Sequence, residues 1–158
     1  MCLTALSIGT MFSCTKSDEE KEEEPTDLYV DLGLPSGTKW KNANEMGFYD
    51  YNEAIEEFGY YLPTKEQFDE LKSSCQWTWD EVKRGSKVEG PNGKSIFLPA
   101  MGYKNCDGSM GYVGTYGTYW SSSHTSAELA YRLSCSSLGP YVFEDLRCMG
   151  LSIRLVQK

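Results

Sequence analysis

Two segments near the end of the chain alternate between apolar and polar residues. Residues 129–133 (LAYRL) and 151–155 (LSIRL) place a large apolar side chain at every second position, which is the period of an antiparallel strand with one buried face. Residues 86–89 and 95–98 flank the turn sequence Gly-Pro-Asn-Gly at 90–93, an arrangement typical of a hairpin. The chain is therefore expected to contain several short antiparallel strands.

A helical period occurs in the middle of the chain. Thr64 is a good N-cap, and Gln67, three residues later, can return the hydrogen bond and complete a capping box. Phe68, Leu71 and Cys75 then lie on one face of a helix, at positions i, i+3 and i+7. Because an isolated amphipathic helix of about ten residues is not stable in water, we expect this helix to pack on a sheet.

A second, shorter helix is expected over residues 53–58, with Asn52 as its N-cap and Gly59 at its end. Residues 101–123 consist mainly of Gly, Tyr and Ser, and we expect long loops there. Together these segments predict an α+β fold, in which one or two short helices pack on short antiparallel strands with long loops between them.

The charge of the chain is concentrated near its beginning. Residues 15–27 hold seven acidic residues against two lysines, a net charge of −5, so residues 28–158 carry −3 of the total −8. A mildly acidic body does not favour nucleic acid, whose binding needs a dense basic face. The same charge does not favour an anionic membrane surface.

The first residues have the properties of an export signal. Residues 3–13 form an uncharged, largely apolar run, too short for the roughly 20 residues that cross a bilayer and typical of a signal peptide. Met11-Phe12-Ser13-Cys14 resembles a bacterial lipobox, so we expect residues 1–13 to be a lipoprotein signal peptide and Cys14 to carry the lipid. No Lys or Arg precedes the run, and we expect a basic segment to be missing from its start. The alternative is an apolar N-terminus without this role.

Residues 14–27 would then be the lipidated cysteine followed by an acidic tether, because like charges without apolar groups do not collapse. Acidic residues directly after a lipidated cysteine resemble the surface-export signal of Bacteroidota lipoproteins. This resemblance implies a lipid anchor in the outer membrane with the rest of the chain exposed at the cell surface. The alternative is a solvated spacer without a sorting role.

The cysteines are consistent with an oxidising compartment. Cys75, Cys106, Cys135 and Cys148 follow the tether, and four cysteines allow three pairings. The candidate disulfide joins Cys135 to Cys148, and simple buried thiols are the alternative. The spacings do not match those of zinc sites and the chain has one histidine, so neither a metal site nor a cofactor is predicted.

Residues 28–158 resemble the Fibrobacter succinogenes major paralogous domain family, because seven motifs occur in the order found there. The motifs are Val30–Trp40, Leu62–Phe68, Cys75–Trp79, Gly90–Gly93, Leu98–Ala100 with Gly102 and Tyr103, Tyr119–Ser123, and Ser152–Val156. The resemblance implies a bacterial surface or secreted module, often on a lipoprotein. It also implies a fold related to the C-type lectin-like and formylglycine-generating-enzyme group. The family has no well-defined biochemical activity.

No group of residues predicts catalysis. The related oxidases use a close cysteine pair near the C-terminus, and Cys135 and Cys148 lack its sequence context. Residues 93–95 end like a P-loop, but Val88 stands where the first glycine is needed. His124 follows three serines without a nucleophile elbow, and we expect it to be an exposed loop residue. Carboxylates are abundant, yet no pair stands out as that of a glycosidase.

Aromatic residues are the remaining candidates for a binding site. The chain has 11 Tyr, 4 Trp and 6 Phe, and flat rings beside small polar groups suit the C–H faces and hydroxyls of a neutral saccharide. Trp40 and Trp120 are expected in the core. The ligand-binding candidates, for which inward packing is the alternative, are Trp77, Trp79, Tyr112 and Tyr116.

These observations predict a noncatalytic, lipid-anchored module of the cell surface that binds a glycan or a protein partner, as an adhesin does. A purely structural lipoprotein domain that recognises only its own assembly is the second hypothesis. An enzyme that acts on glycans through an unrecognised carboxylate pair is the third.

Overall fold

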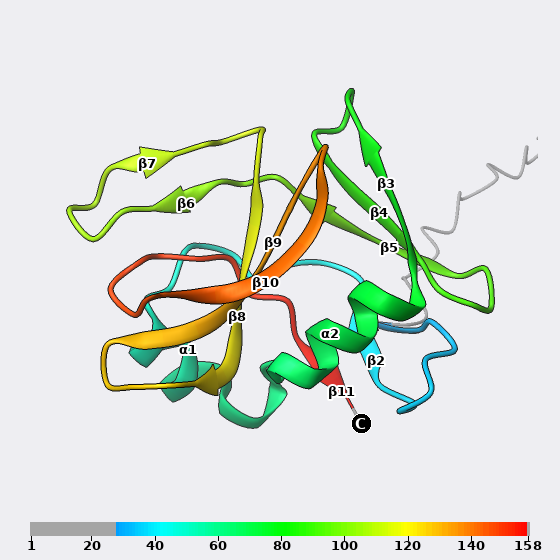
Figure 1. Ribbon diagram of the computed structural model, residues 1–158, viewed down its shortest axis with the longest axis horizontal. Helices are drawn as coiled ribbons and strands as arrows, with labels where there is room; N and C mark the ends of the chain where they lie inside the picture. Colours follow the sequence, from blue (N-terminus) through cyan, green and yellow to red (C-terminus); the bar gives the residue numbers. More distant parts are fainter. Residues whose placement is uncertain (1–27, 158) are drawn as a thin grey trace, which may run out of the picture.

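The computed structural model describes residues 28–157 of the chain. The predicted signal peptide, the lipidated Cys14 and the tether up to residue 27 lie outside these residues. The described segment has an α+β fold, in which two short α-helices pack against small antiparallel sheets (Figure 1). This confirms the predicted class. Within residues 28–157, none of the helices combines the length and the apolar character that crossing a bilayer requires.

Two of the sheets build one end of the molecule (Figure 1). The first joins β1 (Tyr29–Asp31), β2 (Lys39–Lys41) and β11 (Val156–Gln157) in the order β1-β2-β11, so the two ends of the described segment pair with the same strand. The second joins β3 (Gln76–Asp80), β4 (Gly85–Glu89) and β5 (Ser95–Pro99). Strands β4 and β5 are the predicted hairpin, with Val88 opposite Ile96.

The central sheet contains the longest strands among residues 28–157. These are β8 (Gly117–His124), β9 (Leu129–Ser136) and β10 (Gly139–Leu146), in the order β10-β9-β8. A short hairpin of β6 (Tyr103–Lys104) and β7 (Met110–Gly111) extends beside this sheet (Figure 1). The backbone amide and carbonyl of Lys104 both bond to Gly150, which ties the hairpin to the segment that follows β10.

Helix α2 (Lys65–Ser74) begins where the capping box predicts. The backbone N–H of Gln67 donates to the Thr64 hydroxyl at 3.2 Å, and the backbone N–H of Thr64 donates to the side-chain carbonyl oxygen of Gln67 at 2.9 Å. Phe68 and Leu71 are fully buried. Cys75 ends the helix and packs partly buried against the same core, so the predicted apolar stripe is confirmed.

Helix α1 (Tyr51–Phe58) is capped by Asp50, and the prediction of Asn52 as its cap is wrong. The Asp50 carboxylate accepts the Glu53 amide, and the Glu53 carboxylate accepts the Asp50 amide, both at 2.9 Å. Two backbone N–H groups at the helix start are satisfied in this way, whereas Asn52 already lies inside the first turn and is exposed. A 3₁₀ turn, Gly59–Tyr61, connects the two helices.

The core has two parts, each built around a tryptophan. Trp40 packs beside Phe68 with ring centroids 5.6 Å apart. Trp120 lies in the second part, where its indole N–H donates to the Tyr49 carbonyl at 2.9 Å. Both tryptophans are completely buried, which confirms their predicted place in the core.

Two strand predictions need correction. Residues 101–123 contain β6, β7 and most of β8 instead of long loops alone, because residues 117–121 are buried on both faces and therefore show no alternation. Residues 151–155 are buried at every position and form only isolated bridges, such as Tyr49 with Leu151. Apolar–polar alternation there does not mark a half-exposed strand.

The disulfide joins Cys106 to Cys148, with Cα atoms 5.0 Å apart, so the predicted pairing of Cys135 with Cys148 is wrong. Cys135 points from β9 into the core and is 1% exposed, while Cys148 lies exposed on the segment after β10. Burial raises the pKa of the Cys135 thiol to about 11, partly opposed by a hydrogen bond with Ser86. The disulfide therefore connects the loop of the β6–β7 hairpin with the end of the central sheet.

Candidate ligand-binding cleft

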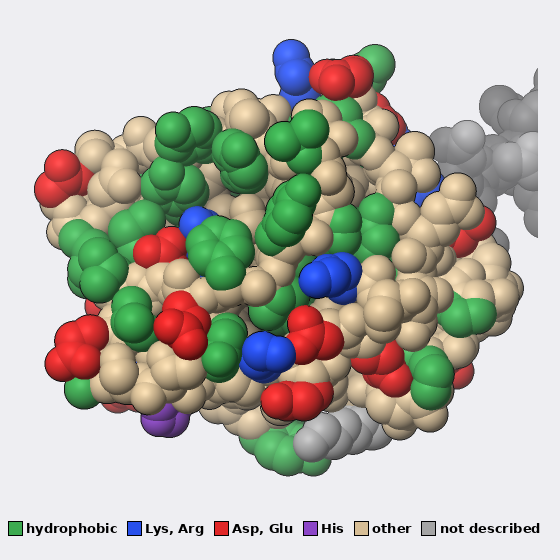
Figure 2. Space-filling model, viewed as in Figure 1, with side chains coloured by type: hydrophobic (Ala, Val, Ile, Leu, Met, Phe, Trp, Pro, Cys, Tyr) green, Lys and Arg blue, Asp and Glu red, His purple; other side chains and the backbone are tan. Residues whose placement is uncertain are grey.

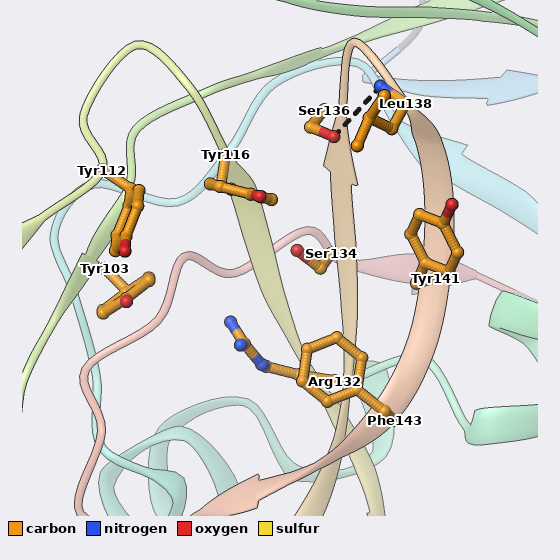
Figure 3. Close-up of a pocket in the computed structure, with 9 residues that line it drawn as sticks. All are labelled: Tyr103, Tyr112, Tyr116, Arg132, Ser134, Ser136, Leu138, Tyr141 and Phe143. Atoms are coloured by element: carbon orange, nitrogen blue, oxygen red, sulfur yellow. Dashed lines mark hydrogen bonds between the residues drawn. The ribbon is translucent and has the colours of Figure 1, made fainter.

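A cleft of about 370 Å³ opens between the β6–β7 side of the molecule and the strands β9 and β10 (Figure 3). Figure 2 shows hydrophobic side chains gathered on this face, over β6, β7 and β10. The volume lies within the usual range of small-molecule sites, about 300–1,000 Å³. The cleft is therefore large enough to hold part of a ligand of that size.

The floor of the cleft comes from one face of β9. Arg132, Ser134 and Ser136 stand at alternate positions of this strand and all three line the cleft, as the two-residue period of a strand requires. On the neighbouring strand β10, Phe143 lies opposite Arg132 and Tyr141 lies opposite Ser134 in the register. A polar row and an aromatic row therefore run side by side.

The opposite wall consists of three tyrosines. Tyr103 comes from β6, and Tyr112 and Tyr116 come from the segment between β7 and β8. Ring centroids are 5.6 Å apart for Tyr103 and Tyr112 and 5.4 Å apart for Tyr112 and Tyr116. Burial raises the pKa of the Tyr103 phenol, and the neighbouring Tyr112 adds to this effect.

The backbone beneath this wall is tightly constrained. Tyr112 has a positive φ of 54°, a conformation that a non-glycine residue adopts at an energetic cost. Gly102 also has a positive φ, and a Cβ atom there would come within 2.2 Å of the Gly111 carbonyl oxygen. The Tyr116 amide donates to the Tyr112 carbonyl at 3.1 Å. These features constrain the backbone that carries the tyrosines.

Arg132 is the charged residue among those that line the cleft, and it is 8% exposed. Its guanidinium carbon lies 4.4 Å from the Phe143 ring centroid and 5.6 Å from that of Tyr103, distances that allow cation–π attraction. In Figure 3 the guanidinium nitrogens point from β9 across the cleft toward the tyrosines. The positive charge is thus held between aromatic faces.

The hydrogen bonds of Arg132 are incomplete. Its Nε lies 2.9 Å from Asp145 Oδ2, an ion pair whose N–H is not aligned as a hydrogen bond, and its Nη1 has no hydrogen-bond partner within residues 28–157. Burial lowers the pKa of the guanidinium, and the Asp145 carboxylate opposes this shift. An arginine side chain stays protonated in proteins, so the cleft presents a cation with at least one unused donor.

The cleft brings together two of the four predicted binding residues. Tyr112 and Tyr116 line it, whereas Trp77 and Trp79 belong to β3 and are not among its lining residues. The Trp77 indole N–H donates to the Leu71 carbonyl at 3.3 Å, and its ring packs against the core. Inward packing, the alternative interpretation, therefore describes Trp77.

Sequence reasoning missed the other half of the cleft, namely Arg132 and the two aromatic residues of β10. Leu129, Tyr131 and Leu133 suggested that the odd positions of β9 face inward and that Arg132 faces water. In the structure Leu133 is buried in the core and Arg132 is buried under aromatic rings on the opposite face. The polar residues at positions 132, 134 and 136 were visible in the sequence, but the aromatic residues that pack over Arg132 were not.

Two other hollows hold less suitable groups. One is lined by Tyr49 and by the acidic residues Glu53, Glu56 and Glu57 of α1. The other contains His124, which is exposed at the end of β8 and whose Nδ1 lies 3.2 Å from the Tyr51 hydroxyl. In the part of the chain that the structure describes, no three His, Cys, Asp or Glu side chains are grouped as metal ligands would be.

Comparisons with known proteins found no matching family model, no similar curated protein and no similar solved structure.

Proposed function

We propose that this protein is a noncatalytic, lipid-anchored module of the cell surface that binds a glycan in the cleft between β6–β7 and β9–β10. The observation that carries the proposal is the composition of that cleft: five aromatic rings surround a floor with two serine hydroxyls. Aromatic faces stack on the C–H groups of a sugar ring, and hydroxyls at the floor exchange hydrogen bonds with it.

The exposure of the rings supports binding over a purely structural role. Tyr112 is 59% exposed and Tyr141 is 54% exposed, so these large side chains are not needed to fill the core. Exposed apolar surface gathered at a concavity is typical of an interaction site. The second hypothesis, a structural domain that recognises only its own assembly, lacks an observation of this kind.

The lining residues also support binding without turnover. The described residues that line the cleft are tyrosines, serines, Phe143, Leu138 and Arg132, with no Asp, Glu, His or Cys from residues 28–157 among them. Hydrolysis of a glycosidic bond usually needs two carboxyl groups about 5–9.5 Å apart, on either side of the bond. Asp145 contacts the Arg132 guanidinium and does not itself line the cleft.

The family and the cellular localisation are parts of the same proposal. We infer membership of the Fibrobacter succinogenes major paralogous domain family, with a C-type lectin-like fold, from the order of the seven sequence motifs. The outer-membrane anchor at Cys14 is inferred from the lipobox and the acidic residues after it. Labelling of cells with radioactive palmitate tests the anchor, and a Cys14→Ala variant that still takes up label would refute it.

A glycan array probed with the purified full chain tests the binding function. We expect a saccharide to be retained by the wild-type chain and to be lost or weakened at least about tenfold by Tyr116→Ala, because the variant removes a stacking face. Tyr61→Ala is the control, since Tyr61 is an exposed tyrosine that lies outside the cleft. An array on which no saccharide binds, or binding that survives Tyr116→Ala unchanged, would overturn the proposal.

A further inference from the structure

We propose that the ligand of the cleft is an acidic saccharide, one whose ring carries a carboxylate or sulfate group, and that this group is bound by the free edge of the Arg132 guanidinium. The inference rests on the proposed function and adds the chemical class of the ligand. It depends on a juxtaposition in the cleft: a buried cation with an unused donor lies beside sugar-sized aromatic faces.

The unused donor is the first step of the argument. A buried N–H group without a partner destabilises a folded protein, and most buried polar groups are therefore hydrogen-bonded. Arg132 Nη1 is an exception, and it belongs to a side chain that is nine-tenths buried. Such a donor, pointing into a cleft (Figure 3), is positioned for an acceptor that the ligand supplies.

The position of Asp145 is the second step. This carboxylate approaches the guanidinium from the Nε side, at 2.9 Å, and leaves the terminal edge to the cleft. A guanidinium presents its donors in a planar fork that matches a carboxylate or a sulfate in a paired, charge-assisted geometry. Asp145 thus orients Arg132 without occupying the edge that would receive a second anion.

The charges of the cleft are the third step. Among residues 28–157, Arg132 is the lining residue with a full charge and no acidic side chain lines the cleft, while Asp145 pairs with Arg132 from outside the lining. The free edge of the guanidinium is therefore the charged group that this part of the chain presents to the cleft. A neutral sugar could accept one hydrogen bond from Nη1, but only an anion also gains from the positive charge in a partly buried site, where screening by water is reduced.

The rings explain why a saccharide is favoured over an acidic peptide. Tyr112 and Tyr116 meet edge to face, and Tyr103 is tilted against Tyr112, so flat surfaces stand next to the Arg132 edge. The serine hydroxyls of β9 lie on the same floor. A sugar ring offers C–H faces, hydroxyls and an acidic substituent within the span of one residue, which matches these three elements.

Calorimetric titration of the full chain with three matched oligosaccharides tests the inference: an oligogalacturonide, a sulfated oligogalactose and the neutral oligogalactose of equal length. We expect at least one acidic oligosaccharide to bind about tenfold or more tightly than the neutral one. The tighter acid identifies the anionic group. Equal affinity for acidic and neutral sugars, or failure of all three to bind, would overturn the inference, whereas an empty glycan array would overturn the proposed function as well.

Variants assign the preference to the guanidinium. In Arg132→Gln combined with Asp145→Asn, which removes both charges together, we expect the acidic preference to fall below about twofold while binding of the neutral sugar persists. Arg132→Lys keeps the charge and loses the planar fork, so it should retain only part of the preference. Arg84→Gln, on an exposed arginine outside the cleft, should leave it unchanged. A preference that survives the double variant, or a glutamate oligopeptide that binds more tightly than either acidic sugar, would contradict the inference.

Discussion

Two arginines are buried in the described part of this protein, and their surroundings differ in every respect that matters for function. Arg154 is 1% exposed, and each of its guanidinium nitrogens donates to an oxygen of the protein. Its acceptors are the Asn44 side chain and the carbonyls of Lys41 and Phe97, at 2.6–2.8 Å. Arg132 has one ion pair and an Nη1 atom without a partner.

The comparison separates two uses of a buried cation. Arg154 connects segments that are distant in the sequence, because its partners come from the end of β2, the loop after β2 and the middle of β5. Burial lowers the pKa of this guanidinium as it does for Arg132. A complete set of acceptors compensates for that burial at Arg154, whereas at Arg132 compensation is left to whatever enters the cleft.

The largest effect is expected from Arg154→Met. The variant leaves the Asn44, Lys41 and Phe97 oxygens without their donor, and a buried acceptor without a partner costs about 1–3 kcal/mol. We expect the free energy of unfolding to fall by about 3–5 kcal/mol in chemical denaturation. Arg84→Met, on an exposed arginine, should change it by less than about 0.5 kcal/mol. A loss at Arg154 as small as at Arg84 would contradict its role as a connector.

The next largest effect is expected from loss of the disulfide that holds the β6–β7 hairpin, the side of the cleft opposite Arg132. Replacement of Cys106 and Cys148 by serine opens a disulfide with a sequence separation of 42 residues, and we expect a loss of about 2–4 kcal/mol in the free energy of unfolding. Because the bond ties the β6–β7 hairpin to the end of the central sheet, sugar binding should weaken as well. Replacement of the buried Cys135 by serine should leave the non-reducing mobility of the chain unchanged, since its thiol is free. A mobility shift in that variant would restore the Cys135–Cys148 pairing.

Local signals in the sequence were sufficient to predict the start of α2 and the place of two tryptophans in the core. The capping box of Thr64 and Gln67 depends on four neighbouring residues, and the structure contains it as predicted. Trp40 and Trp120 were assigned to the core because large rings seldom stay exposed. The cap of α1 follows the same rule, since Asp50 and Glu53 have the capping-box spacing, whereas the residue three positions after Asn52 is Ile55.

The cleft was predictable only in part, because its chemistry depends on contacts between distant segments. Tyr112 and Tyr116 stood out as tyrosines in a glycine-rich stretch. Arg132 did not, since its burial results from Phe143 on β10 and from Tyr103 on a hairpin about thirty residues earlier. The disulfide prediction was wrong for the same reason: the three spacings between the four cysteines contain no information on which loops the fold brings together.

The smallest stability effect should come from Arg132→Met, and this variant decides the comparison. Removal of the guanidinium also removes a buried donor that has no partner, which offsets part of the lost attraction to Asp145. The Asp145 side chain is 22% exposed and can be hydrated once its partner is gone. We therefore expect the free energy of unfolding to fall by about 1–2 kcal/mol, less than the roughly 3–5 kcal/mol typical when one partner of a fully buried ion pair is removed, measured in the same denaturation experiment as Arg154→Met. If Arg132→Met instead destabilised the chain as strongly as Arg154→Met, the guanidinium would be part of the framework, and its unused donor would no longer indicate a ligand.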